Sequence, residues 1–324
     1  MKLRAWLQLF RAQTAPATLL LVMVPYLENA QFLSIETLLL GFYFVLVHYF
    51  SFGHNSLLDT AMGYDVKDPS KVHHPLVSGM IKLSTAHNII HFGLGMLAVT
   101  GTLFSLYAAN PVLAILGLFM FWTWGHCYND GASKTSLFSF LPICLCFTFL
   151  GAWGWFLSHS TINHFGWLLL AYFFMTILFQ ISWSGHLKEL ELREHSNILV
   201  KMGAKVENGN FEPSYAIVYG AVIKFVNIPI LGGLLLVFNF DVFRLIWLCF
   251  MMILVCPYLS KLIRPREYVR ERELLNMSIM EILTIYTPIP LVLPWLEAII
   301  LMVIGVVYFF GMNKVLWRVS YPAV

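Results

Sequence analysis

Long apolar runs alternate with polar loops along almost the whole chain. Each run approaches the ~20 apolar residues that a helix needs to cross a bilayer. The runs contain no regular alternation of apolar and polar positions, so they do not fit the strands of a membrane barrel. We therefore predict an all-α integral membrane protein with about nine transmembrane helices, forming a single domain over 1–324. The expected spans lie at 15–30, 36–53, 86–107, 111–126, 138–157, 165–185, 215–238, 242–260 and 293–312.

The composition excludes a soluble globular protein. Of the 324 residues, 59% are hydrophobic and 11% are charged, and the mean hydropathy is +0.75. The first run, 15–30, has no preceding signal-like segment with a small-residue cleavage site, so we expect it to remain as a span. The five cysteines lie in or at the ends of the runs without the spacing of a metal or disulfide framework, and we expect them to be packing residues.

Positive charge is concentrated in alternate loops. Lys and Arg residues precede the first run and follow the second, fourth, sixth and eighth runs, while the intervening loops contain none. By the positive-inside rule, the N-terminus and the long polar loops are expected in the cytoplasm. Lys314 and Arg318 conflict with this pattern, because a chain of nine spans would place them on the opposite side.

The first polar cluster follows the second run and reads GHNSLLDTAMGYD. Asn55 and Asp59 are four residues apart, so a helix places them on one face. Gly63 is able to end that helix and let Asp65 turn back toward the same face. Such oxygen ligands suit Mg²⁺, which commonly completes its coordination with water and substrate phosphates. The alternative is that these side chains are simply solvated at a helix end.

Basic residues follow this cluster in the same loop. Lys67, Lys71, His73 and His74 lie close enough in sequence to face a metal-bound diphosphate.

A second cluster, GHLKELELREH, follows the sixth run. On a regular helix His186, Glu189 and Arg193 share a face, while Lys188 and Glu191 lie roughly opposite. We expect Glu189 to point into a site shared with Asp59. A salt-bridged, exposed helix end is the alternative.

A third cluster, YNDGASK, follows the fourth run. Tyr128 and Lys134 are candidates to bind phosphate oxygens. The Asn-Asp-Gly sequence is also typical of an ordinary turn.

Together the three clusters resemble the UbiA superfamily of intramembrane prenyltransferases. The menaquinone-type signature N-D-x-x-D-x-x-x-G-x-D corresponds to NSLLDTAMGYD, in which only Ser56 departs. RAQTAP near the start, HPLVSG in the first long loop and the Tyr128 and Lys134 pair are also similar to the family. The resemblance covers nearly the whole chain.

Two departures from the family pattern bear on the proposed chemistry. His74 replaces an arginine or lysine, which makes the charge at that position dependent on pH. Arg193 stands where the second signature has an aspartate. An arginine cannot bind Mg²⁺, but its guanidinium can bind phosphate oxygens, so we expect Arg193 to weaken or replace a second metal position.

The resemblance implies Mg²⁺-dependent transfer of an isoprenoid chain from a diphosphate to a lipid-soluble or aromatic acceptor, by a UbiA-like bundle with cytoplasmic active-site loops. It places the protein among membrane lipids, in a prokaryotic cell membrane, with a role in isoprenoid and quinone biosynthesis and without a nucleic-acid partner. The implied metal ligands are Asn55, Asp59, Asp65 and Glu189. The implied catalytic residues are Asp59, Asp65, Glu189 and Lys134. The residues implied for the diphosphate are Lys67, Lys71, His74, Tyr128, Lys134, Lys188 and Arg193.

Several alternatives remain at this stage. The same fold is known to suit phosphoribosyl transfer to a polyprenyl carrier or cyclisation of an isoprenoid. An ion-coupled transporter would require buried acidic residues in the middle of spans and helices that are interrupted around Gly and Pro. An inactive homologue would account for Ser56 and Arg193.

Overall fold

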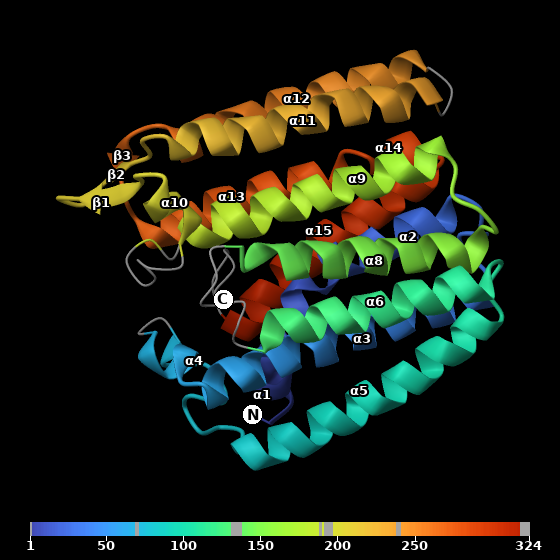
Figure 1. Ribbon diagram of the computed structural model, residues 1–324, viewed down its shortest axis with the longest axis horizontal. Helices are drawn as coiled ribbons and strands as arrows, with labels where there is room; N and C mark the ends of the chain where they lie inside the picture. Colours follow the sequence, from blue (N-terminus) through green and yellow to red (C-terminus); the bar gives the residue numbers. More distant parts are fainter. Residues whose placement is uncertain are drawn as a thin grey trace.

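The computed structural model describes residues 2–68, 71–130, 138–187, 190, 197–237 and 241–317. Lys134, Lys188, Glu189 and Arg193 lie outside these ranges. The described chain is built almost entirely from helices, joined by short turns at one end and by longer polar segments at the other (Figure 1). The helices are α1 (Lys2–Leu9), α2 (Ala15–Leu27), α3 (Ile35–Ala61), α4 (Tyr64–Lys67), α5 (Leu83–Leu106), α6 (Pro111–Asn129), α8 (Phe140–Ser158), α9 (His164–Leu178), α10 (Ile198–Lys201), α11 (Ala216–Val237), α12 (Val242–Ile263), α13 (Arg270–Tyr286), α14 (Ile289–Val292) and α15 (Trp295–Trp317). A short 3₁₀ helix spans Ala12–Thr14, and a π-helix spans Phe179–Gly185.

Nine helices of the described residues are long and apolar enough to cross a membrane, which confirms the predicted fold class. The pair Leu3–Leu9 and Ala12–Leu27, bent by 55°, makes a tenth when it is counted as one span. One span, Leu275–Val292, lies outside the runs that the hydropathy pattern predicts. Its Glu281 and its prolines shorten the continuous apolar stretch, which explains why the hydropathy pattern did not predict this span.

The helices run side by side and the two ends of the bundle differ (Figure 1). At one end the Arg4 guanidinium donates to the Leu316 carbonyl over 2.6 Å, which holds the end of α15 against α1. At the other end the short turns meet: the Asn29 amide donates to the Ser158 carbonyl over 2.8 Å. We call the first end, which carries α1, α4, α10 and the three strands, the polar-loop end.

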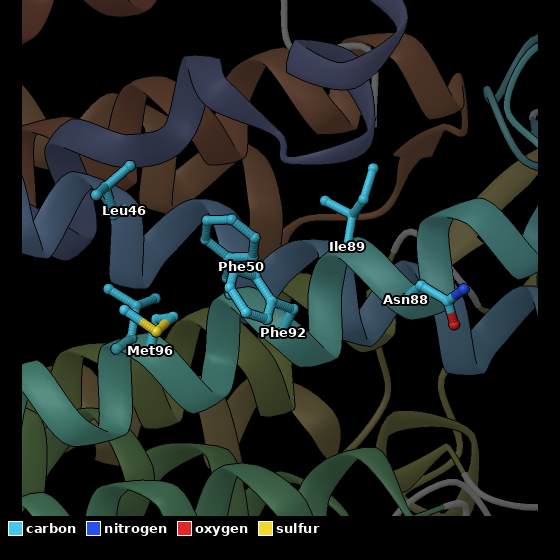
Figure 2. A pocket seen from close by; sticks show the side chains of 8 residues that line it. Leu46, Phe50, Asn88, Ile89, Phe92 and Met96 are labelled. Carbon is cyan, nitrogen blue, oxygen red and sulfur yellow. The ribbon is translucent and has the colours of Figure 1, made fainter.

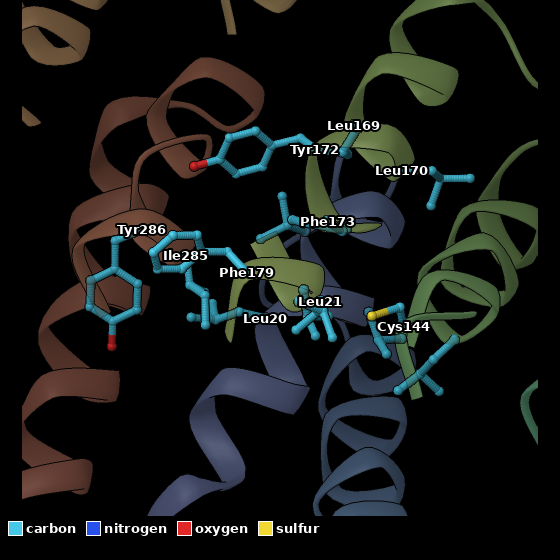
Figure 3. Close-up of a cluster of buried hydrophobic side chains, with 14 of the residues drawn as sticks. Leu20, Leu21, Cys144, Leu169, Leu170, Tyr172, Phe173, Phe179, Ile285 and Tyr286 are labelled. Atoms are coloured by element: carbon cyan, nitrogen blue, oxygen red, sulfur yellow. The ribbon is translucent and has the colours of Figure 1, made fainter. Parts of the chain in front are cut away.

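The helices differ strongly in how much of their surface the protein covers. In the span Leu275–Val292, 67% of the residues are buried, whereas in Val242–Lys261 only 11% of the residues are buried. The first therefore lies inside the bundle, and the second faces lipid. Figure 3 shows part of the core, in which Leu20 and Leu21 of α2 lie among Tyr172 of α9, Phe179 and Ile285 of α13.

A small antiparallel sheet at the polar-loop end was not expected from the apolar pattern. Its strands are β1 (Lys205–Glu207), β2 (Asn210–Glu212) and β3 (Arg266–Glu267), in the order β1-β2-β3. The β1–β2 turn places Asn208 and Gly209 at positive φ, as a tight hairpin requires. Through β3 the sheet joins the segment after α10 to the start of α13.

Candidate active site at the polar-loop end

The first polar cluster occupies the junction of α3 and α4. The helix α3 ends at Ala61, and Gly63 adopts a φ of 81°, which a residue without a Cβ tolerates best. The chain then turns into α4. Asp59 on α3 and Asp65 on α4 are both buried, with exposed fractions of 8% and 7%. The predicted interruption at Gly63 is therefore present, and it separates two buried carboxylates by a single turn.

Asn55 is held by Asn129, a residue to which the sequence pattern assigns no role. Its Nδ2 donates to Oδ1 of Asn129 over 2.9 Å, and Nδ2 of Asn129 lies 3.3 Å from Nδ1 of His54. Asn129 ends α6 directly after Tyr128. Its position within the YNDGASK segment is the one feature of the sequence that could have indicated a role for it. Since the amide NH₂ of Asn55 is engaged, its carbonyl oxygen remains to accept a ligand.

Asp65 has an unusual environment for a carboxylate. Its Oδ2 is buried and has no hydrogen-bond partner among the described residues. Burial of such an oxygen without a partner is costly, so a cation or a donor on a ligand is expected there. Within the described ranges no three His, Cys, Asp or Glu side chains gather closely enough to hold a metal. Glu189, the fourth predicted ligand, lies outside those ranges.

The basic residues after the carboxylates differ in exposure. Lys67 on α4 is exposed, whereas Lys71 is half-buried. His74 is 5% exposed, and neither ring nitrogen has a hydrogen-bond partner among the described residues. Burial, followed by the charges of Lys71 and Arg11, lowers the pKa of His74 to about 3. The ring is therefore neutral near pH 7, and the pH-dependent charge expected at this position does not arise in the physiological range.

An ion pair joins this site to α13. The Arg270 guanidinium lies 3.4 Å from the carboxylate of Asp68, and both side chains are largely covered. Arg270 is the first residue of α13, so the pair brings the interior span toward the loop that carries Lys71 and His74. Hydropathy gives no indication of this contact, because the two residues are far apart in sequence.

The second cluster begins in a helix of unexpected geometry. Phe179–Gly185 is π-helical, so His186 does not follow α9 in a regular α-helical register. His186 is buried: its Nδ1 accepts from the Ile198 backbone over 3.2 Å, and its carbonyl accepts from Asn197 over 2.7 Å. These bonds join His186 to the start of α10. Glu189, Lys188, Arg193 and Lys134 remain predictions, while Tyr128 lies half-buried at the end of α6.

An apolar groove of about 450 Å³ lies on the outside of the bundle between α3 and α5 (Figure 2). Its walls include Phe50 of α3 and Phe92 of α5. Phe50 and Asp59 are nine residues apart, which places them on opposite sides of α3 at about 100° per residue. The groove therefore does not face the carboxylates, and its apolar lining suits a lipid chain.

Several solved structures have a fold similar to that of this chain. A UbiA homologue from Archaeoglobus fulgidus bound to GPP and Mg²⁺ matches with a TM-score of 0.56 and 15% identity, covering 97% of this chain and 100% of its own. A digeranylgeranylglyceryl phosphate synthase matches with a TM-score of 0.59 and 16% identity, covering 89% and 99%. The A. fulgidus homologue bound to Cd²⁺ gives a TM-score of 0.55.

Sequence comparison adds no closer relationship. None of the protein-family models and none of the curated sequences compared with the chain gave a match. At this level of identity the structural matches define the architecture, and the chain therefore has the fold of the UbiA homologues.

Proposed function

We propose that the protein is an intramembrane prenyltransferase of the UbiA superfamily, which moves an isoprenoid chain from a diphosphate to an acceptor within the membrane. One observation carries the proposal: a UbiA fold holds two buried carboxylates, Asp59 and Asp65, on either side of a turn at its polar-loop end. Buried carboxylates are costly unless they bind a cation or a donor, so their burial together favours a site.

Mg²⁺ is the proposed cofactor. The orphaned Oδ2 of Asp65 and the available carbonyl of Asn55 are hard oxygen donors, which fit this ion. Asp59 and Glu189 complete the proposed ligand set. When bound, Mg²⁺ would draw negative charge from the diphosphate leaving group.

The remaining site residues are proposed to hold the donor. Lys67, Lys71, Lys134, Lys188 and Arg193 would neutralise phosphate oxygens as the allylic C–O bond lengthens. Tyr128 would donate a hydrogen bond to the same oxygens. His74, neutral near pH 7, would contribute only an N–H donor, and not a charge.

The apolar interior would serve the rest of the donor. Aromatic side chains such as Phe44 and Trp153 line the core, and their faces attract positive charge. Such walls would keep water away from an allylic cation until the acceptor attacks. The intact spacing of the first signature favours the menaquinone-type branch, with its role in quinone biosynthesis. We place the site on the cytoplasmic side of a prokaryotic membrane from the charge distribution.

Phosphoribosyl transfer and isoprenoid cyclisation remain alternatives on the same fold. An ion-coupled carrier gains support from one observation: the acidic residue Glu281 lies within the span Leu275–Val292, as that class would require. A carrier does not cleave its substrate, so diphosphate release separates the two functions.

The test uses purified protein, labelled geranylgeranyl diphosphate, a panel of acceptors, and buffers with and without Mg²⁺. We expect diphosphate release that needs Mg²⁺ and falls at least ~100-fold in Asp59→Asn. The matched control is Asp241→Asn, because Asp241 caps α12 at the far end and asparagine also caps helices. The absence of diphosphate release with every acceptor, or equal diphosphate release by both variants, would refute the proposed enzymatic function.

A further inference from the structure

Three histidines gather where α3 and α5 pack against each other near the polar-loop end (Figure 1). His87 and His91 are four residues apart on α5, so they lie on one face of that helix, one turn apart. Their rings stack with centroids 4.1 Å apart. The ring of His54 on α3 meets the His91 ring edge-on, with centroids 5.4 Å apart. The proposed diphosphate site uses none of the three.

A hydrogen bond fixes the tautomer of His91. Its Nδ1 lies 2.8 Å from the backbone oxygen of His87. Because a carbonyl oxygen only accepts hydrogen bonds, Nδ1 carries the proton of the neutral ring and Nε2 presents its lone pair. Metal-binding histidines commonly show this arrangement, in which one ring nitrogen donates to a carbonyl and the other binds the ion. The Nε2 atom of His91 is therefore a suitable metal ligand.

His54 supports this orientation from the neighbouring helix. Its edge-on contact restricts rotation of the His91 ring. Its own Nδ1 lies 3.3 Å from Nδ2 of Asn129, the residue that holds Asn55. An amide nitrogen donates, so Nδ1 of His54 accepts, and the proton of its neutral ring lies on Nε2. We therefore assign His54 a supporting role and not that of a ligand.

The histidine pair lies at a depth that ions in water can reach. The helix α5 contains 24 residues. It is therefore ~36 Å long, whereas the hydrocarbon core of a bilayer is ~30 Å thick. The first turns of α5 thus extend toward the lipid headgroups. His87 and His91 belong to these turns, and both side chains are exposed. Ionisable residues within spans usually face the protein interior, so an exposed pair indicates a function at the surface of the helix.

The donor atoms at this position select transition metals over Mg²⁺. Neutral imidazole suits Zn²⁺, Ni²⁺ and Cu²⁺, whereas Mg²⁺ prefers carboxylates, carbonyls and water. Neither α5 nor its neighbour α6 contains an aspartate or a glutamate. Helical zinc motifs likewise hold their metal with two histidines four residues apart. Among the described residues no three His, Cys, Asp or Glu side chains gather closely enough to share a metal. The protein therefore supplies two ligands, and water or headgroup oxygens complete the coordination.

We propose that His87 and His91 form a binding site for a divalent transition metal of the Zn²⁺, Ni²⁺ and Cu²⁺ class on the exposed face of α5. The ion binds Nε2 of His91 and a ring nitrogen of His87. A bound ion stabilises the first turns of α5, because only the folded helix holds the two imidazoles side by side. This site is separate from the proposed Mg²⁺ site and does not depend on the proposed function.

The test measures metal binding by equilibrium dialysis of the purified full chain in nanodiscs, prepared without a polyhistidine tag. The probe is Cu²⁺, which binds nitrogen ligands more tightly than the other ions of this class. We expect the wild type to bind Cu²⁺ with a Kd that rises at least tenfold in His87→Gln and in His91→Gln. The matched control is His164→Gln, because His164 is exposed at the start of α9, at the other end of the bundle. An excess of Mg²⁺ is expected not to displace the Cu²⁺.

Thermal unfolding separates the loss of a ligand from a loss of structure. Without added metal, all three glutamine variants should have the Tm of the wild type, because the substituted rings are exposed. Zn²⁺ should raise the Tm of the wild type and of His164→Gln, and leave that of the two α5 variants unchanged. The proposal is overturned if the wild type binds no Cu²⁺, if Kd is unchanged in either α5 variant, or if Zn²⁺ raises every Tm equally. It is also overturned if alkylation of the exposed cysteines Cys127, Cys249 and Cys256 releases the Cu²⁺, because thiols would then be the ligands.

Discussion

At the scale of single residues, orientation of an amide decides whether it can bind a cation. The carbonyl oxygen of Asn55 is a metal ligand only when its NH₂ group points elsewhere. Oδ1 of Asn129 accepts from that NH₂, and Nδ2 of Asn129 contacts His54. Asn129 is therefore a positioning residue in the proposed site, linking the end of α6 to the proposed metal ligands on α3.

Loss of this bond should weaken Mg²⁺ binding. Asn129→Leu removes the acceptor, and a hydrogen bond of ~1 kcal/mol corresponds to about a fivefold rise in the Mg²⁺ concentration that gives half-maximal diphosphate release. Asn129→Asp keeps an acceptor for Asn55 and should retain the wild-type requirement or lower it. The KM for the isoprenoid diphosphate is expected to change less than the Mg²⁺ requirement in both variants. A fall in Tm with an unchanged Mg²⁺ requirement in Asn129→Leu would show that Asn129 serves packing alone.

At the scale of elements, the α3–α4 junction shows how one backbone conformation arranges the chemistry. Gly63 has a φ of 81° and a Cβ built there would meet no atom within 4 Å. A side chain at this position would therefore be disfavoured by the backbone conformation and not by crowding. Because of that conformation, Asp59 and Asp65 lie on two different helices, and both aspartates are buried.

Gly63→Ala should accordingly destabilise the protein by ~1 kcal/mol or more, since L residues with a Cβ disfavour this conformation. Gly41→Ala is the matched control, because Gly41 also has open space around its Cβ but lies inside α3. The control is expected to be neutral or slightly stabilising. Thermal unfolding in detergent gives the stability of each variant. The rate of diphosphate release shows whether Asp65 still acts in the proposed site. Equal behaviour of the two alanine variants would contradict the assigned role of Gly63.

Local features of the sequence predicted this junction and most spans, because apolar length and a helix-breaking glycine act over a few residues. They did not predict the span Leu275–Val292. The helix α13, which begins before this span and forms its first part, carries Arg270, Glu273 and Glu281, which look unsuited to the bundle interior. Two of them pair with distant residues: Asp68 faces Arg270, and Gln180 binds Glu281. Glu273 pairs with the nearby Arg266 over 2.9 Å. Such tertiary pairing leaves no local signal, and the same applies to Asn129 and to the π-helix.

At the scale of the whole molecule, the additional span resolves the conflict in the charge pattern. Counting the bent α1–α2 pair as one crossing gives ten spans within the described residues. An even number returns the end of α15 to the side of α1, where Arg4 and Gln8 both donate to the Leu316 carbonyl. Lys314 then lies at the polar-loop end with the other positive charges, as the positive-inside rule requires.

Protease accessibility of epitope tags tests this topology. Tags at the N-terminus and the C-terminus should both be cleaved in sealed inside-out vesicles and protected in right-side-out vesicles, because both termini belong to the positively charged side. A tag inserted between Ser160 and Thr161, in the turn between α8 and α9, should show the reverse pattern. Nine crossings would expose the terminal tags on opposite sides. Ten crossings in the inverted orientation would expose both only in right-side-out vesicles, which would move the proposed diphosphate site to the other face of the membrane. The assay therefore separates the number of spans from the side of the membrane on which the proposed carboxylate site lies.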